Sequence, residues 1–404
     1  MPGFFSTSDL AVVETASAIP KCGTCGLLRS CVSPKMKPTG EGKRKVLFIA
    51  EAPGETEDAR GVQLVGEVGQ EFRSRLEDKF GFDLDRDSWK TNSIVCRPPN
   101  NNEPTDLQID SCRPNLLKTI RELQPEIIIL LGTAAVKSLI GYLWRHDESP
   151  GPIGRWVGWK IPSIDFNAWI CPTWHPSYIS RSEKNPVVGL WFDKHLQAAL
   201  DLNGRPYPDG VPDYRSKVER IYEPEKAASI LREMIRRGGV ASWDLETTTL
   251  KPESHHAQIV CCSVCWNGKK TIAYPWVGEA IVATKEFLLA ESIRKVGWNQ
   301  KFETRWAKKI LDIDVVGWIH DGMQCAHVLD NRGGVTGAKF QAFVQLGLPP
   351  YDSAVQQYLK ATGGNAKNKI REVELRDVLL YNGLDSLVEF LIYEKQKQVM
   401  AELE

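Results

Sequence analysis

Two sets of residues in this 404-residue chain have the types and spacings that chemistry requires. One set consists of thiols, and thiolates with short local spacings can wrap one metal centre and fix the segment that carries them. The other consists of acidic residues in the C-terminal half, a residue type that can hold divalent ions. The thiols are Cys22, Cys25, Cys96 and Cys112, and the acidic residues are Asp244, Glu246, Glu303 and Asp385.

The thiol set alone leaves the identity of the metal open. Cys22 and Cys25 form a C-x-x-C pair, and this spacing suits structural zinc as well as an iron–sulfur cluster. Cys31 is a weaker alternative ligand. The three cysteines within residues 258–266 lie in an apolar, strand-like run and are predicted to be core. Ten cysteines, with no signal peptide visible in the first 20 residues, indicate a reducing cytoplasm.

Several polar or small residues of the N-terminal half follow apolar runs that are typical of buried parallel strands. Glu51, Gly132 and His175 each come shortly after one of these runs. Open α/β sheets place their sites at the carboxyl ends of strands, so we expect these residues at one edge of a sheet. The runs are residues 46–50, 127–131 and 169–171.

The C-terminal half follows a turn-rich stretch, residues 203–212, which is typical of a linker. A short helix is predicted at 227–236, and a long amphipathic helix at 372–400. Consecutive strands followed by helices predict an α+β layer with a mixed sheet. The strand-like runs are residues 240–245, 258–266 and 270–274.

These elements would position the acidic residues. The two-residue period of a strand puts Asp244 and Glu246 on one face. Tyr381 and Asp385 are four residues apart and share one face of the closing helix. Glu303 lies near the beginning of another helix, where a carboxylate is electrostatically favoured. The residues predicted to form the buried face of that helix are Phe302, Trp306 and Ile310.

The first 200 residues also carry an ordered set of short motifs. They are Ala50-Glu-Ala-Pro-Gly-Glu-Thr-Glu-Asp58, Gly61, Val65-Gly66, Gly69-Gln70, Asn92, Cys96-Arg-Pro-Pro99, Cys112 and His175-Pro-Ser177. In order and spacing, this set resembles the family 4 (iron–sulfur) uracil-DNA glycosylases. The resemblance implies a three-layer αβα fold with a parallel sheet, in which the four cysteines hold a [4Fe–4S] cluster.

The resemblance also assigns roles in the excision of a flipped uracil. Asn92 would read the edge of the base, and His175 would face the negative charge that develops on it. Glu51 and Glu57 occupy acidic positions of the family, and which of them would position water stays open. Leu64 occupies a base-binding position at which the family has an aromatic residue.

Two departures from the family pattern bear on activity. Leu64 can pack on a base but lacks aromatic stacking, which contributes about 1–3 kcal/mol per base. Ala50 replaces a glycine and restricts close approach of the backbone. We therefore expect the fold and leave uracil excision open. The alternative is a catalytically degenerate module that binds DNA and recruits a replisome partner.

The C-terminal motifs occur in a second ordered set. They are Asp244-Leu-Glu246, Asn299-Gln-Lys-Phe-Glu303 and Tyr381-Asn-Gly-Leu-Asp385. This set resembles the 3′–5′ exonuclease domain of family A DNA polymerases in its tyrosine-bearing (DEDDy) form. The resemblance implies an RNase H-like (DnaQ-like) fold with a mixed sheet, two Mg²⁺ or Mn²⁺ ions on the four carboxylates, and a water oriented by Tyr381. Glu303 replaces the usual aspartate, and Asp321 fits a position that we interpret as structural.

The two resemblances divide the chain into a glycosylase-like domain at residues 1–205, a linker at 206–220 and an exonuclease domain at 221–404. We expect a hydrolase of DNA replication or repair that digests 3′ ends of single-stranded or frayed duplex DNA, including DNA that contains uracil. A DNA polymerase would act with it in trans. Alternatively, the chain is the front part of a larger family A polymerase.

Bulk properties limit where DNA can bind. Basic and acidic residues balance at 51 each, so contact with DNA must come from local patches. The most apolar stretch, residues 126–144, contains Glu126 and Lys137 and is not a membrane span. Such a fusion would suit a phage-encoded replication protein in the host cytoplasm.

Overall fold

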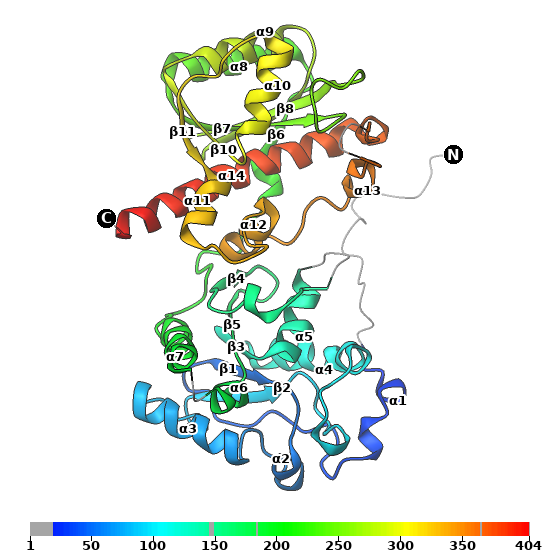
Figure 1. The fold of residues 1–404 in the computed structure, drawn as a ribbon, viewed down its shortest axis with the longest axis vertical. Helices are drawn as coiled ribbons and strands as arrows, with labels where there is room; N and C mark the ends of the chain where they lie inside the picture. The colour runs from blue at the N-terminus through cyan, green and yellow to red at the C-terminus, as the bar shows by residue number, and fades with distance from the viewer. Residues whose placement is uncertain (1–18, 145–148, 183–184, 364–365, 404) are drawn as a thin grey trace. The chain divides into compact units, whose positions relative to one another are not determined.

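The computed structural model describes residues 19–144, 149–182, 185–363 and 366–403. Most of the first 20 residues, from which we expect no signal peptide, lie outside these ranges. The chain divides into two compact units, Met1–Pro206 and Tyr207–Glu404 (Figure 1). In the described ranges, none of the helices has both the length and the apolar character that crossing a membrane requires.

A five-stranded sheet forms the centre of the first unit. Its order is β2 (Ser88–Asn92), β1 (Val46–Ala50), β3 (Ile127–Leu131), β5 (Ala168–Thr173) and β4 (Ile161–Ser163). The first four strands are parallel, and only β4 is antiparallel to its neighbour among these five. Every residue of β1 and β3 is buried, as their continuous apolar runs predict.

Helices cover both faces of this sheet and complete the predicted αβα layers (Figure 1). On one face, Phe72 of α3 and Phe192 of α7 pack with Phe48 of β1. The alternate residues of β1 and β3 face α5, beside which α4 lies. The helices are α1 (Cys22–Cys25), α2 (Glu55–Arg60), α3 (Glu67–Phe80), α4 (Asp106–Leu123), α5 (Thr133–Leu143), α6 (Pro176–Arg181) and α7 (Pro186–Leu200).

The second unit contains a six-stranded mixed sheet. Its order is β11 (Trp318–Asp321), β10 (Ile293–Gly297), β7 (Gly239–Thr247), β8 (Ile259–Trp266), β9 (Lys270–Pro275) and β6 (Val218–Arg220). The three long strands β7, β8 and β9 form an antiparallel meander. β10 and β11 extend it in parallel beyond β7. The predicted mixed sheet is confirmed.

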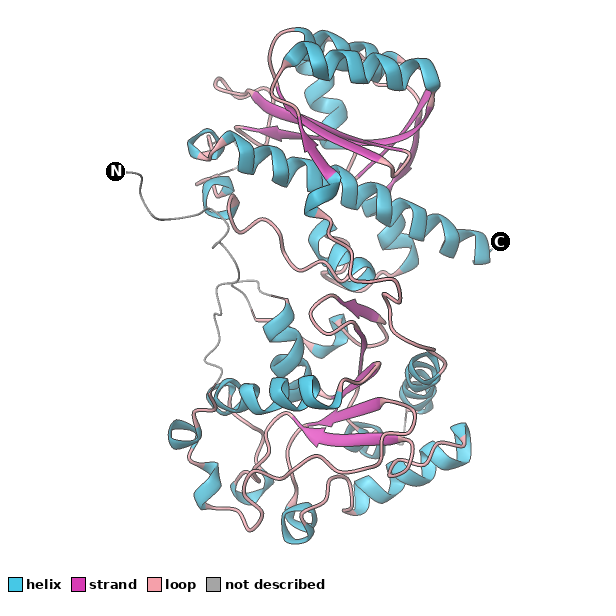
Figure 2. Cartoon of the chain, turned by 180° about the vertical axis from the view of Figure 1, so that it is seen from behind, coloured by secondary structure: helices cyan, strands magenta, loops and turns pink. Residues whose placement is uncertain are grey.

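Helices enclose this sheet from both sides (Figure 2). α8 and α9 cover one face, where Trp243 and Trp306 lie in the core. The long α14 crosses the other face and contacts β7, β8 and β9. The helices are α8 (Pro224–Arg237), α9 (Glu279–Leu289), α10 (Lys301–Leu311), α11 (Gly322–Leu329), α12 (Ala338–Leu346), α13 (Gln356–Leu359) and α14 (Leu375–Leu403).

Short 3₁₀ turns occur in both units. They are Leu27–Arg29, Pro99–Asn101, Ile153–Arg155, Arg215–Lys217 and Ile370–Glu372.

One packing prediction for α10 is wrong. Trp306 is fully buried, but Ile310 is 40% exposed, and Leu311 is buried in its place. The helix is rotated so that its buried residues include Glu303, and Ile310 therefore faces solvent. In contrast, the three cysteines of β8 are buried in the core as predicted.

Candidate active sites

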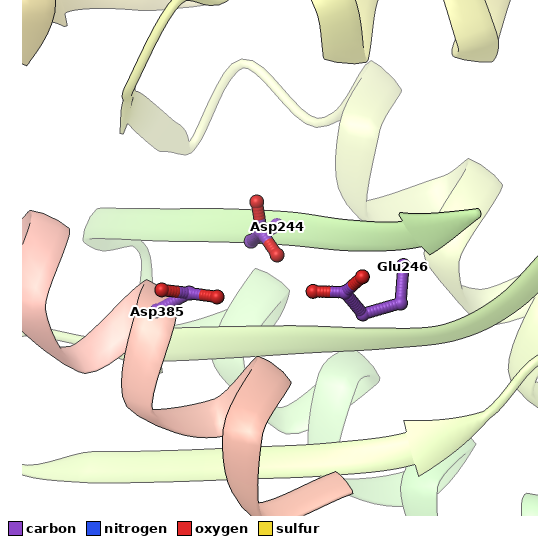
Figure 3. A group of neighbouring side chains, drawn as sticks. All are labelled: Asp244, Glu246 and Asp385. Carbon is purple, nitrogen blue, oxygen red and sulfur yellow. The ribbon is translucent and has the colours of Figure 1, made fainter. Parts of the chain in front are cut away.

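Three carboxylates from two elements meet in the second unit. Asp244 and Glu246 on β7 approach Asp385 on α14, and one oxygen from each lies within 4.8 Å of the other two (Figure 3). The strand period explains the shared face, since the alternate residues Trp243 and Leu245 enter the core on the other side. Carboxylate oxygens at this spacing suit a divalent cation.

Two hydrogen bonds tie β7 to α14 beside these carboxylates. Ser242 Oγ donates to the carbonyl of Ser386 over 2.5 Å. Asn382 Nδ2 donates to Asp244 Oδ2 over 2.7 Å. The sequence prediction missed Asn382, although its position next to Tyr381 on the same helix was a signal. The carboxylates are therefore held on two elements that are bonded to each other.

Glu303, the fourth predicted ligand, is in the first turn of α10 and is 3% exposed. Its Oε2 has no hydrogen-bond partner among the described residues. Burial and the Asp244 carboxylate raise the pKa of Glu303 well above its usual value. A buried carboxylate oxygen without a donor is costly, so this one is expected to be compensated by a cation.

Asp321 holds the backbone from which Glu303 projects. Its carboxylate accepts hydrogen bonds from the backbone N–H of Asn299 over 3.1 Å and of Gln300 over 3.0 Å, directly before α10. It also accepts from Met323 and Gln324 at the beginning of α11. These four bonds give Asp321 a structural task, in line with our interpretation of the sequence.

A lysine that the sequence prediction missed lies against Asp385. Lys339 of α12 forms an ion pair with Asp385 Oδ1, and Tyr351 Oη donates to the same oxygen over 2.5 Å. The Lys339 ammonium also lies 3.9 Å from the ring centroid of Tyr351 and 4.5 Å from that of Tyr381. The Lys339 ammonium, which is paired with Asp385, thus also makes a cation–π contact with Tyr381 and holds that ring beside the carboxylates.

Glu389 is a fifth acidic residue that the sequence prediction missed. It is four residues after Asp385 on α14 and is 6% exposed. Its Oε2 also has no hydrogen-bond partner within the described part of the chain. Tyr381, Asp385 and Glu389 recur at four-residue intervals, so a polar stripe in the buried middle of the helix was the available signal.

The site carries excess negative charge. Burial, followed by repulsion from Asp385, raises the pKa of Asp244 well above its usual value. Burial and the Asp244 carboxylate do the same for Glu246. The Lys339 ammonium acts in the opposite direction on the pKa of both groups. Divalent cations would relieve this repulsion.

The four predicted cysteines line one small cavity in the first unit, together with apolar side chains. The backbone N–H of Lys35 donates to Cys96 Sγ over 3.3 Å, and Asn115 Nδ2 donates to Cys112 Sγ over 3.4 Å. Burial raises the pKa of the Cys96 thiol to about 12. A cationic centre would favour the thiolate forms, so this donor set fits a metal centre.

Four thiol ligands suit either a structural zinc or a [4Fe–4S] cluster. All four predicted cysteines line the same cavity, so the fold brings the whole ligand set together. The Cys31 thiol forms a hydrogen bond with the Cys96 thiol, but Cys31 is not among the residues that line the cavity.

His175 lies at the carboxyl-terminal edge of the first sheet, as predicted, and Asn92 lies at the same edge at the end of β2. Asn92 ends β2, is 3% exposed, and its Nδ2 has no hydrogen-bond partner among the residues that the structure describes. His175 precedes α6, and its Nδ1 accepts from the backbone N–H of Ser177 over 3.2 Å. Burial, with a smaller contribution from Arg181, lowers the pKa of His175 to about 4. His175 is therefore neutral at pH 7, with its proton on Nε2.

The two acidic motif residues have different surroundings. Glu57 Oε1 accepts from the backbone N–H of Val65 over 3.0 Å and of Gly66 over 2.7 Å. Glu57 thus holds the loop after α2. Burial and the nearby Glu103 raise the pKa of Glu51.

Leu64 has an unusual backbone for a bulky residue, with φ of +54°. It is 8% exposed and packs in the core with Phe72. Arg73 Nε donates to the Leu64 carbonyl over 2.8 Å, and a Cβ at Gly69 would lie 2.3 Å from the carbonyl carbon of Leu64. The loop therefore needs glycine at 69 and fixes the side chain at 64.

Known proteins of one superfamily are similar to the first unit. Residues 38–200 match the model of the Uracil DNA glycosylase superfamily. The type-4 uracil-DNA glycosylase of Saccharolobus solfataricus is 34% identical over 165 residues, which are 40% of this chain and 74% of that protein. The type-4 uracil-DNA glycosylase of Pyrobaculum aerophilum is 34% identical over 184 residues, which are 44% of this chain and 87% of that protein.

A longer relative extends across both units. The DNA polymerase of Bacillus phage SP01 is 23% identical over 354 residues, which are 80% of this chain but 37% of that protein. This chain thus spans little more than a third of that polymerase. Among solved structures, Escherichia coli RNase D covers 45% of this chain and 44% of its own, with 15% identity and a TM-score of 0.34. That likeness is too weak to assign an activity, so the function of the second unit rests on its carboxylates.

Proposed function

This chain belongs to the uracil-DNA glycosylase superfamily through its N-terminal unit, and on that premise we propose that it is a DNA-processing hydrolase with two sites. For the second unit we propose metal-dependent digestion of DNA from the 3′ end. The observation that carries this proposal is the convergence of oxygens from Asp244, Glu246 and Asp385 within 4.8 Å. The phage DNA polymerase relative, which extends over most of the chain, supports a role in replication or repair.

The four predicted carboxylates would hold two Mg²⁺ or Mn²⁺ ions, which activate the attacking water and stabilise the leaving 3′ oxygen when bound. Tyr381 lies on the same helix face as Asp385 and would orient the water. Lys339 offsets part of the charge on Asp385. Asn382 fixes the orientation of Asp244 through its amide. Each of these protein groups acts by holding the site in shape before DNA arrives.

A labelled 3′ end tests the nuclease. We expect the wild-type chain to shorten a 3′ overhang in Mg²⁺, and Asp244→Ala or chelator to abolish shortening, with a loss of at least about 10³-fold. Asp314→Ala removes a carboxylate that is 83% exposed in the same unit and serves as the matched control. Digestion that persists in Asp244→Ala at the wild-type rate would reject the proposed nuclease.

For the first unit we propose recognition of uracil in DNA, with excision as its best-supported activity. The unsatisfied Asn92 amide offers a donor to the edge of a flipped base. Neutral His175, with its proton on Nε2, could donate to the oxygen on which charge develops. Glu51 would position the attacking water. A DNA-binding module without excision is the second candidate, because Leu64 lacks the aromatic ring of the family.

Uracil release decides between these two candidates. An oligonucleotide labelled at the uracil should lose its base in the presence of chelator, since excision needs no catalytic divalent ion, and Asn92→Ala should prevent the loss. Retained binding without release at high protein concentration would favour the non-catalytic module. For the cysteine cavity of this unit we propose a [4Fe–4S] cluster, which the shared lining by four cysteines and the type-4 uracil-DNA glycosylase relatives support. Visible absorbance together with iron analysis tests the cluster, and a colourless, zinc-loaded protein would contradict it.

A further inference from the structure

One buried acidic side chain beside the nuclease site has no place in the four-carboxylate set. Glu389 follows Asp385 by one turn of α14 and is 6% exposed. Residues four apart on a helix lie on the same side, with Cβ atoms about 5–6 Å apart. The helix therefore directs Glu389 to the same side as Asp385.

Two oxygens near this position lack any donor. Among the described residues, Glu389 Oε2 and Glu303 Oε2 have no hydrogen-bond partner, and both side chains are more than nine-tenths buried. They come from different helices, α14 and α10. Asp244 acts electrostatically on both groups, and Glu303 also acts on Glu389. Leaving two anionic oxygens unpaired in a protein interior would cost several kcal/mol. Both oxygens therefore lack the compensation that a buried anion needs, and both belong to side chains on which Asp244 acts.

Within the described part of the chain, no lysine or arginine is recorded as acting on both Glu303 and Glu389. Lys339 acts electrostatically on Glu389, but its ammonium is bound to Asp385 and lies over two tyrosine rings. Five ionised carboxylates carry five negative charges. Two divalent ions and the Lys339 ammonium together carry five positive charges, which would balance five ionised carboxylates. A set of only four carboxylates would leave one positive charge unbalanced. The positive charge of Lys339 and the negative charge of Glu389 therefore offset each other within one site.

We propose that Glu389 is a fifth carboxylate of the metal site and binds one of the divalent ions on the side of Glu303. The inference rests on the proposed function only in taking this site to bind metal. Glu303 is one methylene longer than the aspartate of the resemblance, so its carboxylate extends farther from α10. Glu389 then supplies a second oxygen ligand for the ion that Glu303 faces.

Direct metal binding tests the inference without reference to catalysis. Mn²⁺ is titrated into the metal-free wild-type chain, Glu389→Gln and the control Glu394→Gln, which changes an exposed glutamate on the same helix. Free Mn²⁺ is read by electron paramagnetic resonance. We expect Glu389→Gln to weaken one class of sites by about 10- to 100-fold, and Glu394→Gln to match the wild type. Equal affinity and stoichiometry in Glu389→Gln would overturn the inference.

A second variant keeps the test decisive if the amide disturbs folding. Glu389→Asp retains the charge and withdraws the carboxylate by one methylene, so we expect an intermediate Mn²⁺ affinity. Thermal unfolding in chelator shows whether each variant is folded. A purely structural glutamate would change the unfolding temperature and leave the Mn²⁺ affinity of the folded protein unaltered, which would also overturn the inference.

The outcome for the inference is separable from that for the nuclease. If the wild type binds Mn²⁺ but does not shorten 3′ ends, the proposed function fails, and the comparison of Glu389→Gln with Glu394→Gln still decides the role of Glu389. If the wild type digests DNA and Glu389→Gln binds Mn²⁺ normally, the function stands and the inference fails. If no variant, including the wild type, binds Mn²⁺, both are rejected.

Discussion

At the scale of single residues, the second unit contains charge that a metal-free protein cannot balance. Asp244, Glu246 and Asp385 bring carboxylate oxygens within 4.8 Å, and one lysine faces them. Burial and mutual repulsion raise the pKa of Asp244 and of Glu246. A fold that keeps such a cluster without a cation loses stability, and it regains stability when the cation binds.

Neutralising one of these carboxylates should therefore stabilise the metal-free chain. We expect Asp244→Asn to raise the unfolding temperature of the second unit in chelator by about 2–4 °C, the shift that about 1 kcal/mol produces in a domain of this size. The same variant should lose digestion of 3′ ends. Differential scanning calorimetry measures the first effect. A lower unfolding temperature in chelator would contradict the proposed electrostatic repulsion.

The same repulsion predicts the direction of a pH effect. The folded protein holds the proton on Asp244 more tightly than the unfolded chain, so this group contributes stability at low pH. That contribution is lost as the pH rises from about 4, the unfolded value, through the raised pKa of the folded state. In chelator, the stability of the wild type should fall more steeply with pH than that of Asp244→Asn. Parallel denaturant titrations from pH 5 to pH 8 measure the difference, and equal slopes would refute it.

In the first unit, Leu64 gives a gain-of-function prediction. Its backbone is already held at φ of +54° by the Gly69 contact and the Arg73 hydrogen bond. Leu64 packs with Phe72, and the resemblance to the glycosylases also assigns position 64 to the base. On that assignment Leu64→Phe would add aromatic stacking and should raise kcat/KM for uracil release about tenfold, which is roughly 1.4 kcal/mol. Leu64→Ala is the control that removes the side chain, and it should lower kcat/KM for uracil release. An unchanged rate in both variants would show that residue 64 does not contact the base.

At the scale of elements, the sequence predicted what depends on apolar patterning. The runs at 46–50 and 127–131 are strands with the predicted bounds, since a strand buried on both faces leaves a continuous apolar signal. The face shared by Asp244 and Glu246 followed from strand period alone. The rotation of α10 was not predictable in this way. Phe302, Trp306 and Ile310 suggested one stripe, but the buried side includes Glu303, a polar residue that apolar patterning does not register.

Contacts between distant elements were also missing from the sequence prediction. Lys339 and Tyr351 reach Asp385 from segments more than 30 residues away, and no local spacing indicates that approach. Glu389 differs, because a carboxylate at a four-residue interval after Asp385 is visible in the sequence. Recognising it required the further knowledge that this face of α14 is buried.

The beginning of α10 gives the prediction at this scale. Asp321 accepts four backbone hydrogen bonds and thereby fixes the turn that presents Glu303. Asp321→Asn leaves one acceptor oxygen and adds a donor that faces N–H groups. We therefore expect the free energy of unfolding to fall by about 2–4 kcal/mol. The Mn²⁺ affinity should fall with it, because Glu303 loses its fixed position. Asp314→Asn is the exposed control, and Asp321→Asn with wild-type stability in urea would contradict this role.

At the scale of the molecule, each unit contains all the parts of its own site. The cysteine cavity and the Asn92 edge belong to Met1–Pro206, and the carboxylates with their helices belong to Tyr207–Glu404. Each unit also has its own sheet and buried core. This organisation predicts that damage to one metal centre leaves the chemistry of the other unit unchanged.

The variant Cys112→Ser tests whether the two units function independently. Cys112 joins α4 to the cavity that the N-terminal Cys22 and Cys25 also line, so losing this ligand should release the cluster and the segment it fixes. We expect loss of visible absorbance and a fall of about 10–20 °C in the unfolding temperature of the first unit, from a cost of roughly 5 kcal/mol. Digestion of 3′ ends should continue at the wild-type rate, because no carboxylate of that site depends on the cluster. Cys171→Ser, a buried cysteine outside the cavity, controls for loss of a core thiol. A nuclease that fails together with the cluster in Cys112→Ser, but not in Cys171→Ser, would instead mean that the two sites are coupled.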